Sequence, residues 1–238
     1  MCKIYSLIVR LALTGIVSGI FCPVTLSATS YIKTLLATQR TNDNTALIQS
    51  YLDDPNCTKI IIPLSSSNAS WPVRPLFFNH NNTEIHLNSN TVLEALIGGY
   101  PNGADCVLKA TSLSNIKVTS DAGSKILMHK EEYALLTAAE WRHALNFTSC
   151  SSVTVSGVTL ANTGGDGIYL GDADSINHTG YCSNVIIANV VTDGAGRNGL
   201  SVISVDGLTV TGCTFKNTKG QGNVAVYGPW AGIDLEPN

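Results

Sequence analysis

Two carboxylates near the end of the chain, Asp234 and Glu236, have a spacing that suits acid and base chemistry. In a strand, residues two apart project from the same face, with Cα atoms about 7 Å apart. Carboxylates so placed can act as acid and base, or as acid and nucleophile, on a glycosidic bond. They can equally bind a calcium ion. A third reading is two solvated surface acids beside the turn-forming Pro237.

His143 and Asp166 fall at equivalent positions of the repeats described below, where neighbouring coils bring them roughly 5 Å apart. A histidine beside a carboxylate can be held in one tautomer and act as a base near neutral pH. Asp166 lies in a Gly-Gly-Asp-Gly corner, so the alternative is that its carboxylate only binds backbone amides of that turn.

Arg142 and Arg197 occupy an adjacent column of the repeats. Guanidinium groups bind carboxylates through two parallel hydrogen bonds, so the pair predicts a clamp for a uronic acid or a sulfated sugar. The alternative is that the two arginines form ion pairs with Asp193 or Glu140.

Tyr169, Ser201 and Trp230 are predicted to lie on the same face, where the two aromatic rings would offer flat apolar surface to sugar rings. Packing beneath a loop is an equally common role for such rings. Asp172 and Asp174, in a Gly-Asp-Ala-Asp turn, resemble half of a calcium loop, although a solvated turn explains them better. We therefore assign no metal ligand, and calcium is the one cofactor left open.

An internal repeat indicates how these residues are positioned. Each unit of about 23 to 32 residues holds a short strand, a Gly or Asn break and a second short strand, and a further strand lies between units. Such units cannot enclose a core singly but can stack into a solenoid. We predict an all-β parallel β-helix, with a β-sandwich as the alternative. The superimposable segments are Ser152–Leu160, Asn184–Thr192 and Gly207–Phe215, and in a second set His143–Phe147, Asp166–Leu170, Asn198–Val202 and Ala231–Leu235.

Alternation along each strand assigns its residues to the core or to the surface. The predicted inward stacks are Leu145, Ile168, Leu200, Ile233 and Phe147, Leu170, Val202, Leu235, with Val153, Val185, Leu208 and Val155, Ile187, Val210 on another sheet. The predicted outward columns are Asn146, Tyr169, Ser201, Asp234 and Thr148, Gly171, Ile203, Glu236.

The earlier part of the chain is predicted to hold a leader, a cap and less regular coils. Residues 1–28 have the basic start, apolar stretch and small final residues of a secretory signal peptide. Residues 29–58 form a predicted N-terminal cap region, with helical apolar spacing over Thr41–Tyr51. The β-helix is predicted over 59–238, with Ser124–Glu140 as a loop that leaves the stack. Earlier strands are predicted at Lys59–Pro63, Thr83–Leu87, Thr91–Ala95 and Asn115–Thr119.

Charge and glycosylation signals favour a secreted protein, which we expect to be a monomer. Loss of Lys3 and Arg10 with the signal peptide leaves 12 of the 14 basic residues against 17 acidic ones. Such a chain does not suit nucleic-acid phosphates, and we expect no membrane contact after cleavage. Five Asn-x-Ser/Thr glycosylation acceptors fit a secretory route, at Asn56, Asn68, Asn81, Asn146 and Asn177.

Asn146 shares an outward column with Tyr169 and Asp234, so a glycan there would cover part of the predicted site. Either Asn146 is unmodified, or the functional surface begins nearer Asp234, or this face binds nothing.

The cysteines predict disulfides and no zinc site. Five remain after the signal peptide, and none has C-x-x-C spacing. Cys150 and Cys182 fall at equivalent positions of neighbouring coils, within disulfide distance, and are predicted to be bonded. Cys213 falls in an inward column and is expected to be a buried free thiol. Cys57 and Cys106 would pair only by elimination.

Four segments resemble the right-handed β-helix proteins of the pectate-lyase-like superfamily: Glu140–His143, Gly164–Gly171, Arg197–Ile203 and Ala231–Asn238. The resemblance runs from about Lys59 onward and implies a right-handed, single-stranded β-helix. Members of that superfamily cleave or epimerise acidic polysaccharides, hydrolyse glycosides or have no assigned activity. The Asp clusters of polygalacturonases and the Asp, Arg and Lys pattern of calcium-dependent pectate lyases are not reproduced. The repeat stops inside its last motif, so we expect further coils beyond Asn238.

These features predict a secreted protein that acts on an extracellular polysaccharide along an outer-face groove, as a glycoside hydrolase or a uronate lyase or epimerase. The alternative is a non-catalytic extracellular glycan-binding or surface protein. The enzymatic hypothesis requires the catalytic set to converge on one concavity. The predicted catalytic residues are Asp234, Glu236, Asp166, His143 and Arg197, and the predicted substrate-binding residues are Tyr169, Ser201, Trp230 and Arg142.

Overall fold

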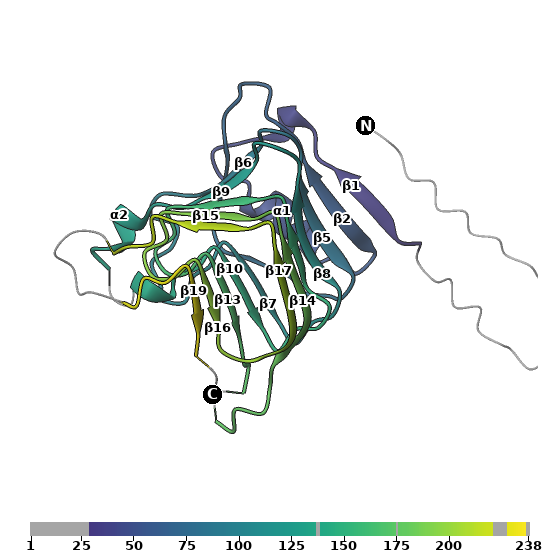
Figure 1. Cartoon of the computed structure of the whole chain (residues 1–238). Coiled ribbons are helices and arrows are strands. Elements are labelled where there is room, and N and C mark those ends of the chain that lie inside the picture. Colours follow the sequence, from purple (N-terminus) through teal and green to yellow (C-terminus); the bar gives the residue numbers. More distant parts are fainter. Residues whose placement is uncertain (1–28, 137–138, 175, 221–227, 237–238) are drawn as a thin grey trace, which may run out of the picture.

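The computed structural model describes residues 29–136, 139–174, 176–220 and 228–236, so the predicted signal peptide lies outside it. Within these residues the chain winds through three sheets that form the sides of a tube, viewed along its axis in Figure 1. Strands of neighbouring coils pair in parallel in all three sheets. The protein is therefore a β-helix-like solenoid, and the β-sandwich alternative is wrong because sandwich sheets are antiparallel.

Each sheet takes strands from successive coils. The first sheet consists of β1 (Tyr31–Thr34), β2 (Cys57–Ile62), β5 (Thr83–Leu87), β8 (Ile116–Ser120), β11 (Thr154–Ser156), β14 (Cys182–Ala188) and β17 (Val205–Thr211). The second sheet consists of β4 (Leu76–Phe77), β7 (Leu108–Thr111), β10 (Leu145–Thr148), β13 (Ile168–Gly171), β16 (Leu200–Val202) and β19 (Ile233–Leu235). The third sheet consists of β3 (Trp71–Val73), β6 (Val92–Ala95), β9 (Lys125–Leu127), β12 (Thr159–Ala161), β15 (Val191–Asp193) and β18 (Thr214–Lys216).

The predicted register of the coils is confirmed. Ile168 pairs with Leu145 on one side and with Leu200 on the other, and Leu200 pairs with Ile233. Solvent does not reach Leu145, Ile168 or Leu200. Ile233 is 43% exposed because β19 is the edge strand of the second sheet. The aliphatic stacks therefore fill the tube. The predicted outward columns point away from it, but their members Ser201, Asn146 and Gly171 are buried by neighbouring residues and not on the surface.

The break inside each repeat is a turn from the first sheet to the third. Its equivalent residues, Gly157, Asn189 and Gly212, have φ values of 76°, 55° and 63°. Gly and Asn adopt this left-handed conformation more readily than other residues. A Cβ on Gly212 would also collide with the Asn189 side chain of the neighbouring coil. Successive coils therefore turn at the same place, which keeps their strands in register.

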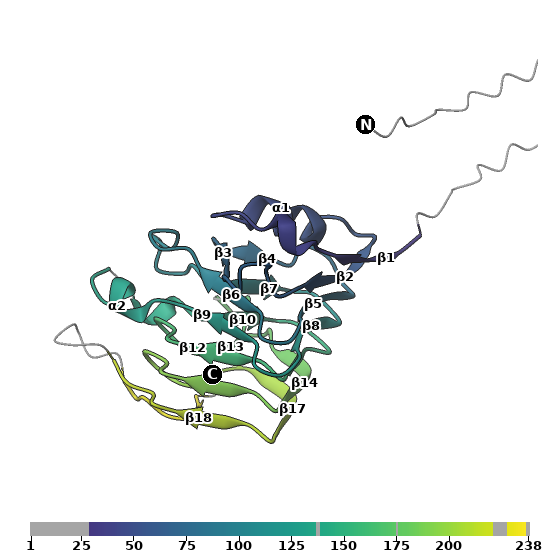
Figure 2. The ribbon, with the colours of Figure 1, turned by 90° about the horizontal axis from the view of Figure 1, so that it is seen from above.

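Helix α1 (Thr45–Leu52) lies across the end of the stack at which the described chain begins (Figure 2). Ile48 and Leu52 are fully buried against the core. The helix begins at Thr45, later than the predicted Thr41, because Thr41 is held in a turn by a 2.7 Å hydrogen bond from its N–H to Asn44 Oδ1. Strand β1, which precedes α1, extends the first sheet into the segment predicted as a cap.

The other helical segments are short: η1 (Ala37–Gln39), α2 (Lys130–Tyr133) and η2 (Ala139–Trp141). Across the described part of the chain, no helix has both the length and the apolar character needed to cross a membrane.

The prediction that Ser124–Glu140 leaves the stack is wrong for its first part. Residues Lys125–Leu127 form β9, which pairs with β6 and β12 in the third sheet. Only Ile126 of this strand is fully buried, so its alternation is too short to be recognised in the sequence. The remainder of the segment carries α2 and η2, and Tyr133 is buried beside Tyr100.

The predicted Cys150–Cys182 disulfide is wrong, and all five cysteines among the described residues are free thiols. The register behind the prediction is right, because the adjacent Ser151 and Ser183 are bridged between the two coils. The two sulfur atoms nevertheless face different backbone carbonyls. Cys150 Sγ lies 3.4 Å from Thr148 O, and Cys182 Sγ lies 3.4 Å from Phe147 O. Cys57, Cys106 and Cys213 are likewise unpaired.

Candidate functional site

The candidate site lies where the chain enters the strands of the second sheet. His143, Asp166, Asn198 and Ala231 occupy equivalent positions, each two residues before a strand. The backbone N–H of Asp166 donates to His143 Nδ1, that of Asn198 donates to Asp166 Oδ1, and that of Ala231 donates to Asn198 Oδ1, each at 2.9 Å. Each side chain thus accepts a hydrogen bond from the backbone of the next coil. This pattern fixes the orientation of three polar side chains in a row.

Asp166 is fully buried and has polar contacts on both carboxylate oxygens. Oδ1 accepts the Asn198 N–H, while Oδ2 lies 3.3 Å from Arg197 Nη1 and 3.3 Å from His143 Nδ1. Burial raises the pKa of Asp166 to about 6, against the opposing effect of the Arg197 charge. The alternative that Asp166 only binds backbone amides is therefore incomplete, because an ion pair is present as well.

His143 is also buried, and burial lowers its pKa to about 3. The imidazole is therefore neutral near pH 7. Because Nδ1 accepts a backbone hydrogen bond, the proton of the neutral ring is on Nε2. Gly165 makes room for this ring, since a Cβ at that position would lie 2.8 Å from His143 Nδ1.

The remaining predicted catalytic residues join the same network. Arg197 Nη2 lies 3.2 Å from Glu236 Oε2, so the guanidinium bridges Glu236 and the buried Asp166. Asn198 Nδ2 donates to Asp234 Oδ2 at 2.9 Å. The structure therefore brings the five predicted catalytic residues together, linked through Asn198. Sequence analysis did not assign Asn198 a role, although its position equivalent to His143 and Asp166 could have identified it.

Solvent exposure divides the network into residues that are buried and residues that a ligand can reach. The side chains of His143 and Asp166 are 1% and 0% exposed, so neither can touch a ligand in this conformation. The Glu236 side chain is 50% exposed and that of Arg197 is 17% exposed, while Asp234 is half-buried. The accessible chemistry is therefore that of Asp234, Glu236 and Arg197.

An aromatic wall borders the network. The rings of Tyr169 and His143 are stacked, with centroids 4.9 Å apart and planes inclined by 11°. Trp141 lies 6.3 Å from Tyr169 and 6.2 Å from His143, and it is 48% exposed. Gly171 leaves space for the wall, since a Cβ there would come within 2.5 Å of the Tyr169 ring. Sequence analysis missed Trp141, which precedes His143 by two residues in the Glu140–His143 motif.

Arg142 is not part of a substrate clamp. Its side chain is fully buried and donates to the carbonyls of Tyr100 and Pro101, each at 2.9 Å. The prediction that Arg142 and Arg197 form a clamp on one face is wrong, because the Arg142 side chain points toward the segment that precedes β7. The two backbone carbonyls accept hydrogen bonds from the Arg142 guanidinium, a charged group that the sequence alone would place on the surface.

Two other predicted substrate-binding residues differ in accessibility. Ser201 is fully buried, and its hydroxyl accepts a hydrogen bond from Asn198 Nδ2 at 3.0 Å. It therefore helps to orient the Asn198 amide and cannot contact a ligand. Trp230 is 37% exposed, and its backbone carbonyl accepts a hydrogen bond from the Thr218 hydroxyl at 2.8 Å.

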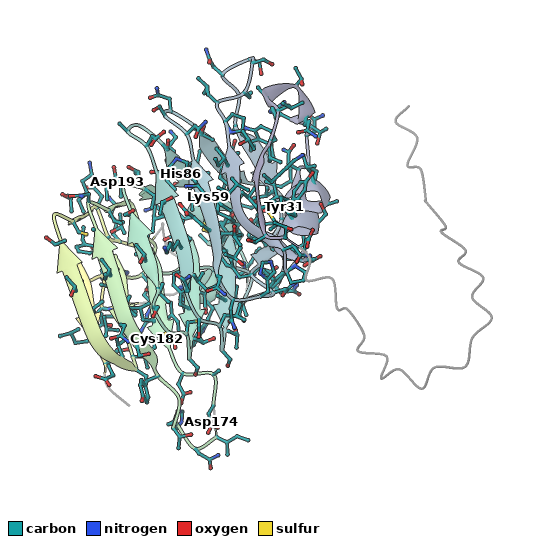
Figure 3. The ribbon with its side chains drawn as sticks, turned by 90° about the vertical axis from the view of Figure 1, so that its right-hand side faces the viewer. Tyr31, Lys59, His86, Asp174, Cys182 and Asp193 are labelled. Carbon is teal, nitrogen blue, oxygen red and sulfur yellow. The ribbon has the colours of Figure 1, made fainter. Side chains whose placement is uncertain are left out.

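The Asp172 and Asp174 turn is held by its own hydrogen bonds. Asp174 lies in the loop that projects from the solenoid in Figure 3. Its carboxylate accepts hydrogen bonds from the Asn177 N–H, the Thr179 hydroxyl and the Ile176 N–H, which lower the pKa of Asp174 to about 2. Asp172 Oδ1 accepts the Asp174 N–H at 2.7 Å. Within the described ranges, no three His, Cys, Asp or Glu side chains come together as metal ligands, so the calcium reading gains no support.

Comparison with known proteins gives a likeness in fold alone. No family model matches the chain, and no curated protein matches it. Among solved structures, it is similar to a putative glycosyl hydrolase from Parabacteroides merdae, with a TM-score of 0.61 and 16% sequence identity. The match covers 86% of this chain and 98% of that one. At this identity, the likeness concerns the fold alone and carries no assignment of activity.

Proposed function

We propose that the protein is a secreted, polysaccharide-active member of the right-handed, pectate-lyase-like β-helix class, with α1 as its N-terminal cap. In this proposal it hydrolyses glycosidic bonds at Asp234 and Glu236. The main support for this proposal is the hydrogen-bond network in which Arg197 bridges a buried Asp166 and an exposed Glu236, while Asn198 positions Asp234. The resemblance of the sequence motifs and the description of the Parabacteroides merdae protein agree with a substrate of sugar units.

In the proposed reaction, one of the two carboxyl groups donates a proton to the leaving glycosidic oxygen. The other, as a carboxylate, removes a proton from an attacking water or attacks the sugar carbon directly. Asp234 lies in β19 and Glu236 directly follows this strand, and their contacts to Asn198 and Arg197 bring both carboxylates to the same network. Arg197 orients Glu236, and it can also bind a negatively charged sugar substituent. Asp166 and His143 act as positioning residues for Arg197.

The aromatic wall gives this proposal a place for a sugar ring. The half-exposed Trp141 and the Tyr169 ring present apolar surface, and strand β16 separates Tyr169 from Asp234. Sugar rings have apolar faces of similar size, and aromatic side chains bind them by burying that surface. A uronate lyase or epimerase reaction at the same residues is a variant of this proposal.

A non-catalytic glycan-binding protein is the second candidate. It is favoured by the full burial of His143 and Asp166, two of the five residues expected to do chemistry. Such a protein would keep Trp141, Tyr169 and Arg197 as binding groups and would not need Asp234 or Glu236 to exchange protons.

Incubation of the full chain with neutral, uronic and sulfated polysaccharides separates the two candidates. Release of shorter sugars by the wild-type protein, lost in Asp234→Asn, supports catalysis. Binding without release of any product, unchanged in Asp234→Asn, contradicts it.

A further inference from the structure

A cavity of about 270 Å³ lies at the other end of the second sheet, remote from Asp234. We propose that it is a second subsite, which binds a negatively charged unit of a long polysaccharide. This inference rests on the proposed polysaccharide surface and extends it toward α1. The cavity is lined by Phe77, Phe78, Asn79, Lys109, Thr111 and Leu113.

The register places this cavity and the candidate site in one line. Phe77 pairs with Lys109, Lys109 with Asn146, and Asn146 with Tyr169. Tyr169 in turn pairs with Ser201, which pairs with Asp234. At roughly 4.8 Å per coil, Lys109 lies about 10 Å from Tyr169 and Phe77 about 24 Å from Asp234 along the stack. A ligand that touches both ends must therefore be an extended chain that crosses the strands.

Lys109 supplies the positive charge of the proposed subsite. It lies in the middle of β7, half-buried, and no described carboxylate forms an ion pair with its ammonium group. The lysines Lys59 and Lys216, by contrast, pair with Glu84 and Asp193 on the other two sheets. An unpaired lysine inside a cavity can receive a carboxylate or a sulfate.

Asn146 occupies the next coil of this line and is almost fully buried. Its residue is 9% exposed, and its Oδ1 atom has no hydrogen-bond partner among the described residues. A buried acceptor without a partner is costly, so Asn146 marks a polar position under the surface that joins Lys109 to Tyr169. Asn146 therefore continues the polar line between Lys109 and Tyr169.

Phe77 supplies a rigid apolar platform. It is 44% exposed, although most aromatic rings of this size are mainly buried. Its backbone N–H donates to Gln49 Oε1 at 3.0 Å, and its carbonyl accepts from Gln49 Nε2 at 2.9 Å. Gln49 belongs to α1, so the helix fixes the backbone of Phe77 at the cavity rim. A ring beside an ammonium group suits a sugar that carries one negative charge.

The test compares Lys109→Gln and Phe77→Ala with the wild-type full chain, using calorimetry with oligosaccharides of increasing length. Three series are used: uronic acid units, sulfated units and neutral units. Lys117→Gln is the matched control, because Lys117 is also half-buried in the middle of a strand but belongs to the first sheet. Thermal unfolding of each variant verifies that the fold is intact.

We expect Lys109→Gln to weaken binding of long charged oligosaccharides about fivefold, with no change for neutral ones or for units too short to reach β7. Phe77→Ala should weaken binding of every long ligand about fivefold. The uronic and sulfated series distinguish a carboxylate from a sulfate as the bound group. Equal affinities of wild-type protein and both variants for all long ligands overturn the subsite.

The outcome is separable from that of the proposed reaction. If polysaccharide is cleaved but neither variant alters binding, the catalytic proposal stands and the subsite fails. If binding depends on Lys109 but no sugar is released by the wild-type protein, the subsite stands and catalysis fails.

Discussion

The imidazole Nδ1 of His143 accepts a 2.9 Å hydrogen bond from the backbone N–H of Asp166, one coil further along the chain. This contact requires a neutral ring with its proton on Nε2. A protonated ring would lose the contact and would carry a charge into a site with 1% exposure. The folded protein therefore resists protonation of His143, although the adjacent Asp166 carboxylate would favour it.

This resistance predicts an acid-sensitive fold. The pKa of His143 is about 3 in the folded protein, against an ordinary value of 6.5, so the unfolded chain binds the proton more tightly. The contribution of His143 to stability is complete above pH 6.5 and is lost as pH falls toward 3. Between pH 7.5 and pH 5 the wild-type protein should lose about 2 kcal/mol of unfolding free energy that His143→Gln does not lose. Urea unfolding at both pH values measures the difference.

Asp166 acts in the opposite sense, because its folded pKa is raised to about 6. Its contribution to stability is complete below about pH 4 and is lost as pH rises through 6. The His143 comparison should therefore be repeated in an Asp166→Asn background. An equal pH dependence with and without His143 in that background would contradict the neutral buried imidazole.

The exposed carboxylates should be needed for turnover and not for folding. We expect Asp234→Asn and Glu236→Gln each to lower kcat about 10²- to 10⁴-fold on the cleaved polysaccharide, because each removes an acid or base group. Their thermal unfolding should stay close to that of the wild-type protein, since both side chains reach solvent. Asp206→Asn, which changes an exposed acid of the first sheet, is the control. Unaltered turnover in both site variants would exclude them as catalytic residues.

Trp141 should contribute to sugar binding through its exposed ring. Trp141→Ala is expected to raise KM about three- to tenfold, because the apolar platform beside Tyr169 is lost. Trp141→Phe should recover most of the affinity. Tyr181→Ala removes another half-exposed ring, ahead of β14 in the first sheet, and should leave KM unchanged. A similar rise in KM in Trp141→Ala and Tyr181→Ala would mean that the effect is not specific to the aromatic residues beside His143.

The Asn146 acceptor should remain unglycosylated in the folded protein. Asn146 is 9% exposed within β10, whereas Asn68, Asn81 and Asn177 are exposed. A glycan on a buried strand residue would separate Tyr169 from the neighbouring coil. Peptide mass spectrometry of protein secreted from eukaryotic cells should find glycans at the exposed acceptors and none at Asn146. A fully occupied Asn146 in correctly folded protein would contradict the packing of the second sheet.

The five described cysteines should all react as thiols once the protein is unfolded. In the folded state the reaction should be slow, because burial raises the pKa of Cys106 and of Cys182 to about 11. Thiol titration with and without denaturant, both without reductant, measures this. A denatured count two below five would indicate one disulfide.

The sequence was sufficient to predict the stacked architecture, because each coil repeats the same two-residue alternation. Ile168 and Leu200 could be aligned without a gap, and their pairing follows directly. The same alignment placed His143 beside Asp166 and Asp234 beside Ser201. Strand β9 was missed because one inward residue, Ile126, carries too little periodicity.

Side-chain direction outside the strands could not be predicted. Arg142 and Arg197 are equivalent in the alignment, yet one is buried among carbonyls and the other bridges two acids. Cys150 and Cys182 are neighbours in register, but their sulfur atoms turn toward separate carbonyls. Alternation decides the face of a residue in a strand, while turn residues depend on rotamers and on local hydrogen bonds.

The network that links His143, Asp166, Asn198 and Asp234 draws its members from four successive coils. Each coil contributes one polar side chain that bonds the next coil, while its own aliphatic residues fill the tube. A substitution of an exposed member such as Glu236 can therefore alter the surface chemistry of one coil without changing the packing of the others. Such a scaffold can acquire a different ligand preference by changes confined to a single turn of the solenoid.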